Sequence, residues 1–231
     1  MLYEVKYPLK AEIDFSFLLM RGYYIISMVI IAISIIIFLW SFEKRKPKTR
    51  EVVLLSVMTA LAIVGRVAFF MTPQIKPCAA IIIITGIMLG KQSGFLCGVF
   101  TAFVSDFFFG QGPWTPWQMM AFGIIGFLSA VIFSNKLKKF IYSRVMISIY
   151  GFLVTFFVYG IVMDTATVFM YTDEPKLSVF LATYISGIFF NMIHGLSTAV
   201  FLFLLSKNIF VKIERLKNKF DMFCTYRRNN E

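Results

Sequence analysis

Charged residues are scarce in this sequence. Only 15% of its 231 residues are charged, whereas a typical soluble domain carries about 25%. Hydrophobic residues make up 59%, which exceeds the usual share of about 45–50%. These two departures exclude an ordinary soluble domain as the main body of the chain, and they indicate a protein whose solvent is largely lipid.

Motifs for catalysis and metal binding are also missing. The chain has one histidine, His194, and three cysteines, Cys78, Cys97 and Cys224, which share no metal-ligand spacing. It contains no Gly-x-Ser-x-Gly, His-Glu-x-x-His or Walker sequence. We therefore expect no enzyme activity, no catalytic residue, no metal and no cofactor. Because the chain has no Walker sequence, it cannot use ATP alone, and any uphill transport needs another source of energy.

What the sequence does contain is a series of long apolar runs. A helix needs roughly 20 apolar residues to cross the hydrocarbon layer, and such runs use most of the chain. The predicted helices cover residues 23–42, 52–71, 78–90, 93–109, 117–134, 145–170 and 177–206. The fold class expected from this pattern is all-α, a polytopic membrane helix bundle with no clear internal repeat.

The basic residues orient this bundle. With residues 1–22 outside, the segments predicted to lie inside hold 17 Lys and Arg residues and those outside hold 5. Because positive charge favours the cytoplasmic side, the C-terminus is expected to be cytoplasmic. The net charge of +11 then reflects topology and contact with anionic lipid rather than nucleic-acid binding. An alternative for residues 23–42 is a helix lying in the interface, which leaves six crossings.

Ionisable residues inside a membrane are expensive and mark candidate functional sites. Arg66, Asp106 and Asp164 fall in the predicted outer half of the bundle. An ion pair between Arg66 and Asp106 that only holds two helices together is the structural alternative. Asn191 and His194 share one face of the last helix. That face lines either a cavity or a helix contact made by hydrogen bonds.

Residues 110–117, which read GQGPWTPW, form the most informative loop. Two glycines and two prolines restrict its shape. Trp114 and Trp117 offer flat apolar faces and indole N–H donors to a ligand, or they serve as interface anchors. Gln111 and Gln118 add neutral hydrogen-bonding groups. The segment is typical of ligand binding.

Residues 102–119, AFVSDFFFGQGPWTPWQM, resemble the substrate-binding S components of energy-coupling factor (ECF) vitamin transporters. Residues 65–69, 76–80 and 159–163 support the resemblance, which covers about residues 52–206. The loop resembles most closely a subgroup that takes corrinoids such as cobalamin.

This resemblance implies a six-helix core over residues 52–206, preceded by a tail, an additional helix and a basic linker over 1–51 and followed by a basic cytoplasmic tail over 207–231. It also implies a bacterial cell-membrane protein that captures a vitamin outside. Its partners would be a transmembrane coupling subunit and two cytoplasmic ATPases. The residues expected to bind substrate are Arg66, Lys76, Asp106, Gln111, Trp114, Trp117, Gln118, Asp164 and Asn191.

Family members often carry small residues four apart on the first core helix, where the coupling subunit docks. Here the nearest match is Ser56 with Ala60, and small residues at this spacing allow two helices to approach closely. Two functions of other classes remain as alternatives. One is a stand-alone, proton-coupled secondary transporter, and the other is a membrane assembly or sensor protein that transports nothing.

Overall fold

The structure, a computed structural model, describes residues 15–44, 47–133, 143–172 and 175–220. In these ranges the secondary structure is helical, which confirms the predicted fold class. The helices are α1 Phe15–Lys44, α2 Thr49–Ala68, α3 Cys78–Leu89, α4 Lys91–Phe109, α5 Thr115–Ile132, α6 Arg144–Leu153, the π-helical turn η2 Val154–Tyr159, α7 Gly160–Tyr171 and α8 Leu177–Lys219. The ends of the two predicted tails, 1–14 and 221–231, lie outside the described residues.

Five of the described segments are long and apolar enough to cross a membrane. They are α2, α4, α5, the continuous segment Arg144–Tyr171 and α8. At 12 residues, α3 is roughly 18 Å long, too short to cross a layer of about 30 Å. The crossing by α1 stays a prediction, because α1 is not among these five segments.

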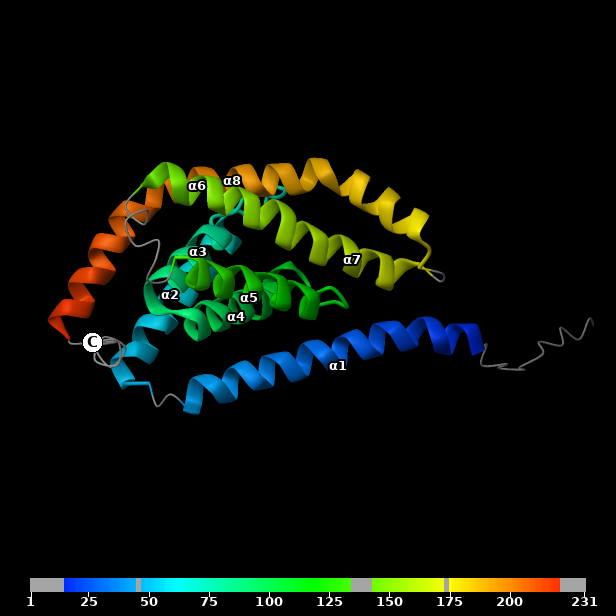
Figure 1. The fold of residues 1–231 in the computed structure, drawn as a ribbon, viewed down its shortest axis with the longest axis horizontal. Helices are drawn as coiled ribbons and strands as arrows, with labels where there is room; N and C mark the ends of the chain where they lie inside the picture. The colour runs from blue at the N-terminus through cyan, green and yellow to red at the C-terminus, as the bar shows by residue number, and fades with distance from the viewer. Residues whose placement is uncertain (1–14, 45–46, 134–142, 173–174, 221–231) are drawn as a thin grey trace, which may run out of the picture.

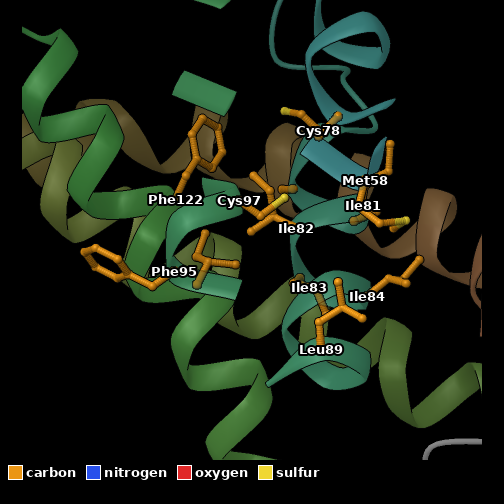
Figure 2. Packing of buried hydrophobic residues seen from close by; sticks show 14 of the residues in the cluster. Met58, Cys78, Ile81, Ile82, Ile83, Ile84, Leu89, Phe95, Cys97 and Phe122 are labelled. Carbon is orange, nitrogen blue, oxygen red and sulfur yellow. The ribbon is translucent and has the colours of Figure 1, made fainter. Parts of the chain in front are cut away.

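Helix α3 forms the centre of the bundle. Its sequence, CAAIIIITGIML, has no polar face, and ten of its twelve residues are buried. A helix that is apolar all round needs neighbours on every side, and α2, α4, α5 and α8 all contact it. Figure 2 shows Ile82, Ile83 and Ile84 packed among side chains of the surrounding helices. The central position of α3 fixes the relative placement of α2 and α4.

Helices α4 and α5 pack unusually closely, side by side in Figure 1. A Cβ atom added to Gly126 would lie 2.1 Å from the Gly94 carbonyl oxygen, and one added to Gly98 would lie 2.2 Å from the Phe122 carbonyl oxygen. Only glycine leaves room for backbones at this separation. This contact holds the Asp106 end of α4 against the first turns of α5.

The last two predicted helices differ from the observed ones in shape. The run predicted as one helix over 145–170 contains the π-helical turn η2, which is a form rare in proteins and frequent at functional sites. The helix predicted to end at residue 206 continues without a break to Lys219. Its extension is anchored because Phe210 and Ile213 are buried, so the first half of the predicted C-terminal tail is structured.

Candidate functional site

Arg66 and Asp106 form a buried ion pair near one end of the bundle. Arg66 lies in the last turn of α2, and Asp106 lies one turn before the end of α4. Their side chains are joined by a bond of 2.7 Å between Nη1 and Oδ1, as the shared height of the two residues suggests. Arg66 is 5% exposed and Asp106 is fully buried. Two charges in such a place require further polar partners.

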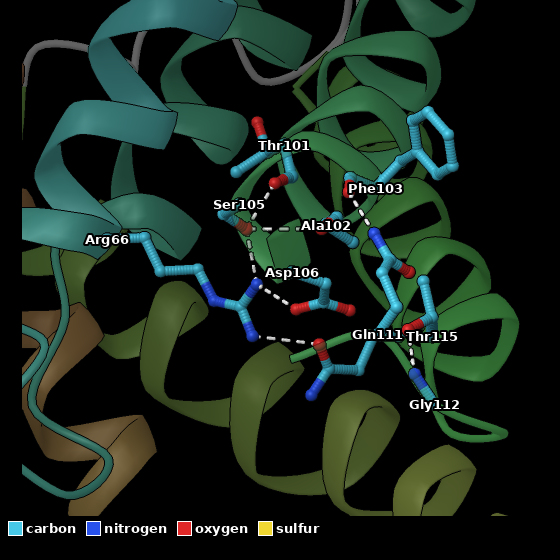
Figure 3. A network of polar contacts seen from close by, with 10 residues as sticks. Arg66, Thr101, Ala102, Phe103, Ser105, Asp106, Gln111, Gly112 and Thr115 are labelled. Atoms are coloured by element: carbon cyan, nitrogen blue, oxygen red, sulfur yellow. Dashed lines mark hydrogen bonds and ion pairs between the residues drawn. The ribbon is translucent and has the colours of Figure 1, made fainter. Parts of the chain in front are cut away.

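Arg66 has two further polar partners (Figure 3). Its Nη1 also donates to the Ser105 hydroxyl, and its Nη2 donates to Gln118 Oε1 at 2.8 Å. The guanidinium carbon lies 4.7 Å from the ring centroid of Phe109 and 5.8 Å from that of Phe122. Arg66 therefore links α2, α4 and α5 and is fixed in one orientation by hydrogen bonds and aromatic faces.

Lys76 brings a second cation to this site. Its Nζ lies 4.5 Å from the centroid of the Phe109 ring, so the ring is close to both Lys76 and Arg66. The backbone of Lys76 is held by Ser197 of α8, whose hydroxyl accepts from the Lys76 N–H at 3.0 Å. Burial, followed by the charge of Arg66, lowers the pKa of Lys76. Two cations and one carboxylate leave a positive site, which favours ligand groups that accept hydrogen bonds.

Three buried polar atoms on α4 and α5, the helices that bond Arg66, lack a hydrogen-bond partner within the described part of the chain. They are the second carboxylate oxygen of Asp106, Oδ2, the hydroxyl oxygen of Thr101 and the indole nitrogen of Trp117, Nε1. The Trp117 ring stacks on Phe169 of α7 with centroids 6.0 Å apart. A buried polar group without a partner is costly, so a ligand group that reached such an atom would be stabilised by pairing with it.

An aromatic cluster that the sequence interpretation left out lies next to Arg66. Phe122 contacts Tyr159, with centroids 4.9 Å apart, and Tyr159 contacts His194 at 4.6 Å. These three residues come from α5, η2 and α8. His194 is 3% exposed, and its Nδ1 is another buried atom that finds no hydrogen-bond partner in the described ranges. Only the position of His194 on the inner face of α8 pointed to this cluster.

The loop residues Gln111 and Trp114 point elsewhere. Gln111 is exposed, and its Nε2 donates to the Phe103 carbonyl oxygen at 2.9 Å, as Figure 3 shows. The Trp114 ring covers Gly112, since a Cβ atom added there would lie 2.4 Å from the ring. Trp114 therefore supports the shape of its own loop. The structure gives neither side chain a hydrogen bond to Arg66.

Asp164 and Asn191 form a separate polar contact between α7 and α8. Asn191 Nδ2 donates to Asp164 Oδ2 at 2.9 Å, and both side chains are partly buried. Gly187 and Gly160 make room for them, because a Cβ atom at either position would collide with the Asp164 or Asn191 side chain. The pair holds these helices together whether or not it also meets a ligand.

Ser56 and Ala60 occupy the outward side of α2. Both are exposed, together with Val53, Val57 and Val64. The Ser56 hydroxyl donates to the carbonyl oxygen of its own helix at Val52, which removes a polar donor from this surface. The face is therefore apolar, with small residues four apart.

Comparison with known proteins gives a family. The family described as "ECF-type riboflavin transporter, S component" matches residues 46–210, which begins at the basic linker and ends in the extension of α8. Two UPF0397 proteins of Aliivibrio fischeri, from strains MJ11 and ATCC 700601 / ES114, are each 28% identical over 103 residues, which is 41% of this chain and 56% of the relative. The chain thus spans about half the length of these curated relatives. No solved structure matches it.

The family match covers α2 through most of α8, which includes the Arg66 network and the aromatic cluster beside it. Helix α1 lies before the matched range. With five segments able to cross a membrane, this makes the chain a multi-pass membrane protein. It belongs to the family of S components of ECF-type riboflavin transporters.

Proposed function

We propose that this protein is the substrate-binding component of an ECF-type importer. It binds a vitamin at the Arg66 end of the bundle and delivers it inward together with a transmembrane coupling subunit and two cytoplasmic ATPases. The observation that carries the proposal is the buried Arg66–Asp106 pair in a chain of this family, with the Asp106 Oδ2 atom left without a partner among the described residues. The chain supplies binding and not catalysis.

The chemistry of the site supports a flat heteroaromatic ligand. Arg66 and Lys76 carry N–H donors, while Asp106 Oδ2 is an acceptor without a partner among the described residues. This pattern complements a ring edge in which carbonyl groups flank an N–H group. The partly buried ring of Phe109 beside Arg66 offers a stacking face. Riboflavin, named in the family description, has such an edge, and we propose it as the ligand in place of the corrinoid favoured by the loop alone.

Calorimetry on the purified chain tests this proposal. We expect riboflavin to bind. Adding cobalamin as a competitor should leave the riboflavin affinity unchanged. Trp114→Ala should weaken riboflavin binding by about tenfold, or ~1.4 kcal/mol, because the loop over Gly112 loses its support and must be ordered on binding. Trp40→Ala is the matched control, since Trp40 is exposed on α1, and it should bind as the unmodified chain does. Binding of cobalamin with no binding of riboflavin would reverse the ligand assignment.

The coupling subunit is proposed to dock on the outward side of α2. Ala60→Trp should abolish assembly with the coupling subunit and vitamin uptake, because a large ring on a small-residue face separates the two helix backbones. Riboflavin binding by the isolated chain should remain, since Ala60 faces away from the bundle. Co-purification and an uptake assay measure these effects. As the control, Val200→Trp places the same ring on an exposed position of α8, and this variant should assemble normally. If Ala60→Trp also assembled normally, the coupling subunit would have to dock on another face.

In this arrangement the basic ends of α1, α2 and α8 lie in the cytoplasm and the loops 69–77 and 110–114 lie outside. The excess of basic residues in the predicted inner segments supports this orientation.

A further inference from the structure

Helix α1 is fastened to the bundle by specific contacts. The Phe38 ring stacks on Phe95 of α4, with centroids 3.8 Å apart, and meets Phe127 of α5 edge-on at 5.5 Å. Gln92 Nε2 donates to the Ser41 hydroxyl at 2.9 Å. Phe95 is 1% exposed, and its ring also lies close to Gly123 of α5. These contacts give α1 a defined position against α4 and α5.

Beside these contacts lies a cavity of about 250 Å³ between α1 and the bundle. It is lined by Ile37, Phe38, Ser41, Lys91, Gln92 and Phe127. The lining is graded along α1, because Ser41 lies one helical turn, about 6 Å, nearer the basic end than Ile37. The polar residues Ser41, Gln92 and Lys91 thus lie toward that end, and the apolar residues Ile37 and Phe38 lie farther from it along α1.

Lys91 is the charged residue in this lining, and it is exposed at the first position of α4. The Ser41 hydroxyl, which accepts from Gln92, still has its own proton to donate. A cation and a hydroxyl above an apolar wall match an amphiphile with an anionic head and a hydrocarbon tail. Basic pockets between membrane helices bind the head groups of anionic lipids for this reason.

We propose that this cavity is a binding site for an anionic phospholipid, with the phosphate at Lys91 and Ser41 and an acyl chain along Ile37, Phe38 and Phe127. Because α1 precedes the matched residues 46–210, the site is not a shared property of the family match. The lipid fills the gap between α1 and α4, and it joins the additional helix to the vitamin-binding core.

Native mass spectrometry of the full chain in mixed micelles of detergent with phosphatidylglycerol or phosphatidylcholine tests the proposal. The unmodified chain should retain one phosphatidylglycerol in preference to phosphatidylcholine. Lys91→Gln should reduce this preference by about fivefold, equivalent to the ~1 kcal/mol that one basic residue contributes near a charged lipid. Ile37→Trp should fill the cavity and lower the occupancy of both lipids without any change of charge.

Lys207→Gln is the matched control, because Lys207 is an exposed lysine on α8 outside the cavity lining. It should retain the lipid preference of the unmodified chain. An unchanged preference in Lys91→Gln, or an equal loss in Lys207→Gln, would overturn the site, since the preference would then come from the overall charge. Riboflavin affinity measured on Lys91→Gln should not change, so failure of the lipid site and failure of the proposed vitamin binding are distinguishable.

Discussion

Asp106→Asn is expected to destabilise the protein and to weaken riboflavin binding together. The substitution removes the negative charge beside Arg66, which is 5% exposed, and an uncompensated buried charge costs roughly 3 kcal/mol. For a chain of this size we expect a melting temperature lower by roughly 10 °C. Affinity should fall at least about tenfold, because Oδ2 no longer serves as a carboxylate acceptor for a ligand N–H. Thermal unfolding in detergent and calorimetry measure the two effects.

Asp164→Asn is the matched control for this change. Both substitutions replace a carboxylate with an amide. The partner of Asp164, however, is the neutral amide of Asn191 at 2.9 Å, and the Asp164 side chain is only partly buried. An asparagine at position 164 keeps an oxygen that accepts from Asn191, so stability should change by less than about 1 kcal/mol. If the two substitutions destabilised the protein equally, Asp106 would not owe its stabilising effect to the charge of Arg66.

The double variant Arg66→Met/Asp106→Leu separates binding from folding. Replacing both members of a buried pair with apolar residues is often neutral for stability, so the double variant should melt closer to the unmodified chain than Asp106→Asn does. It should still fail to bind riboflavin, because both the donor and the acceptor are gone. Tight binding by this variant would make the pair a purely structural link between α2 and α4.

The length and apolar character of the helices were predictable because they depend on composition over many residues. Predicted starts and ends lie close to the observed ones for α2 through α5, where charged or Gly/Pro-containing segments flank the apolar runs. The end of α8 was not predicted, since the basic residues from Lys207 onward suggested a basic, amphipathic tail separate from the helix. The buried residues Phe210 and Ile213, three apart, carried the signal that the helix continues along the core.

The polar centre of the site was predictable for a similar reason. Arg66, Asp106 and Gln118 are polar residues at comparable depth on helices that pack together, and the structure joins them by hydrogen bonds. Gln111 and Trp114 lie in a loop whose course depends on Gly110, which has a φ of 97°. Side-chain directions from such a loop follow from local backbone geometry, which residue type alone does not specify.

The aromatic cluster of Phe122, Tyr159 and His194 could not be predicted from the sequence for a different reason. Tyr159 ends the π-helical turn η2, which has a different residue period from the α-helix on either side. An apolar run such as 145–170 contains no pattern that marks this change of period. The turn places Tyr159 against Phe122 and His194, so this part of the site depends on tertiary packing.

Gly126→Ala is the smallest substitution expected to prevent folding. Its new Cβ atom would lie 2.1 Å from the Gly94 carbonyl oxygen, and α4 and α5 cannot separate without also moving α3, which contacts both. Even one extra methyl group in a packed core costs about 1–3 kcal/mol, and here the obstructing atom belongs to the backbone. We therefore expect a loss of at least about 3 kcal/mol, seen as little or no monodisperse protein on size exclusion in detergent.

Gly151→Ala provides the comparison that assigns this loss to the backbone. Its added Cβ atom would also meet an atom at 2.1 Å, but that atom is the Leu202 Cδ1 at the end of a flexible side chain. Rotation of Leu202 relieves the overlap, so Gly151→Ala should yield folded protein with a melting temperature within a few degrees of the unmodified chain. Normal folding of Gly126→Ala would mean that α4 and α5 tolerate a wider separation. In that case the close approach would not be what holds Asp106 and Gln118 around Arg66, and the geometry of this candidate site would depend on its own hydrogen bonds.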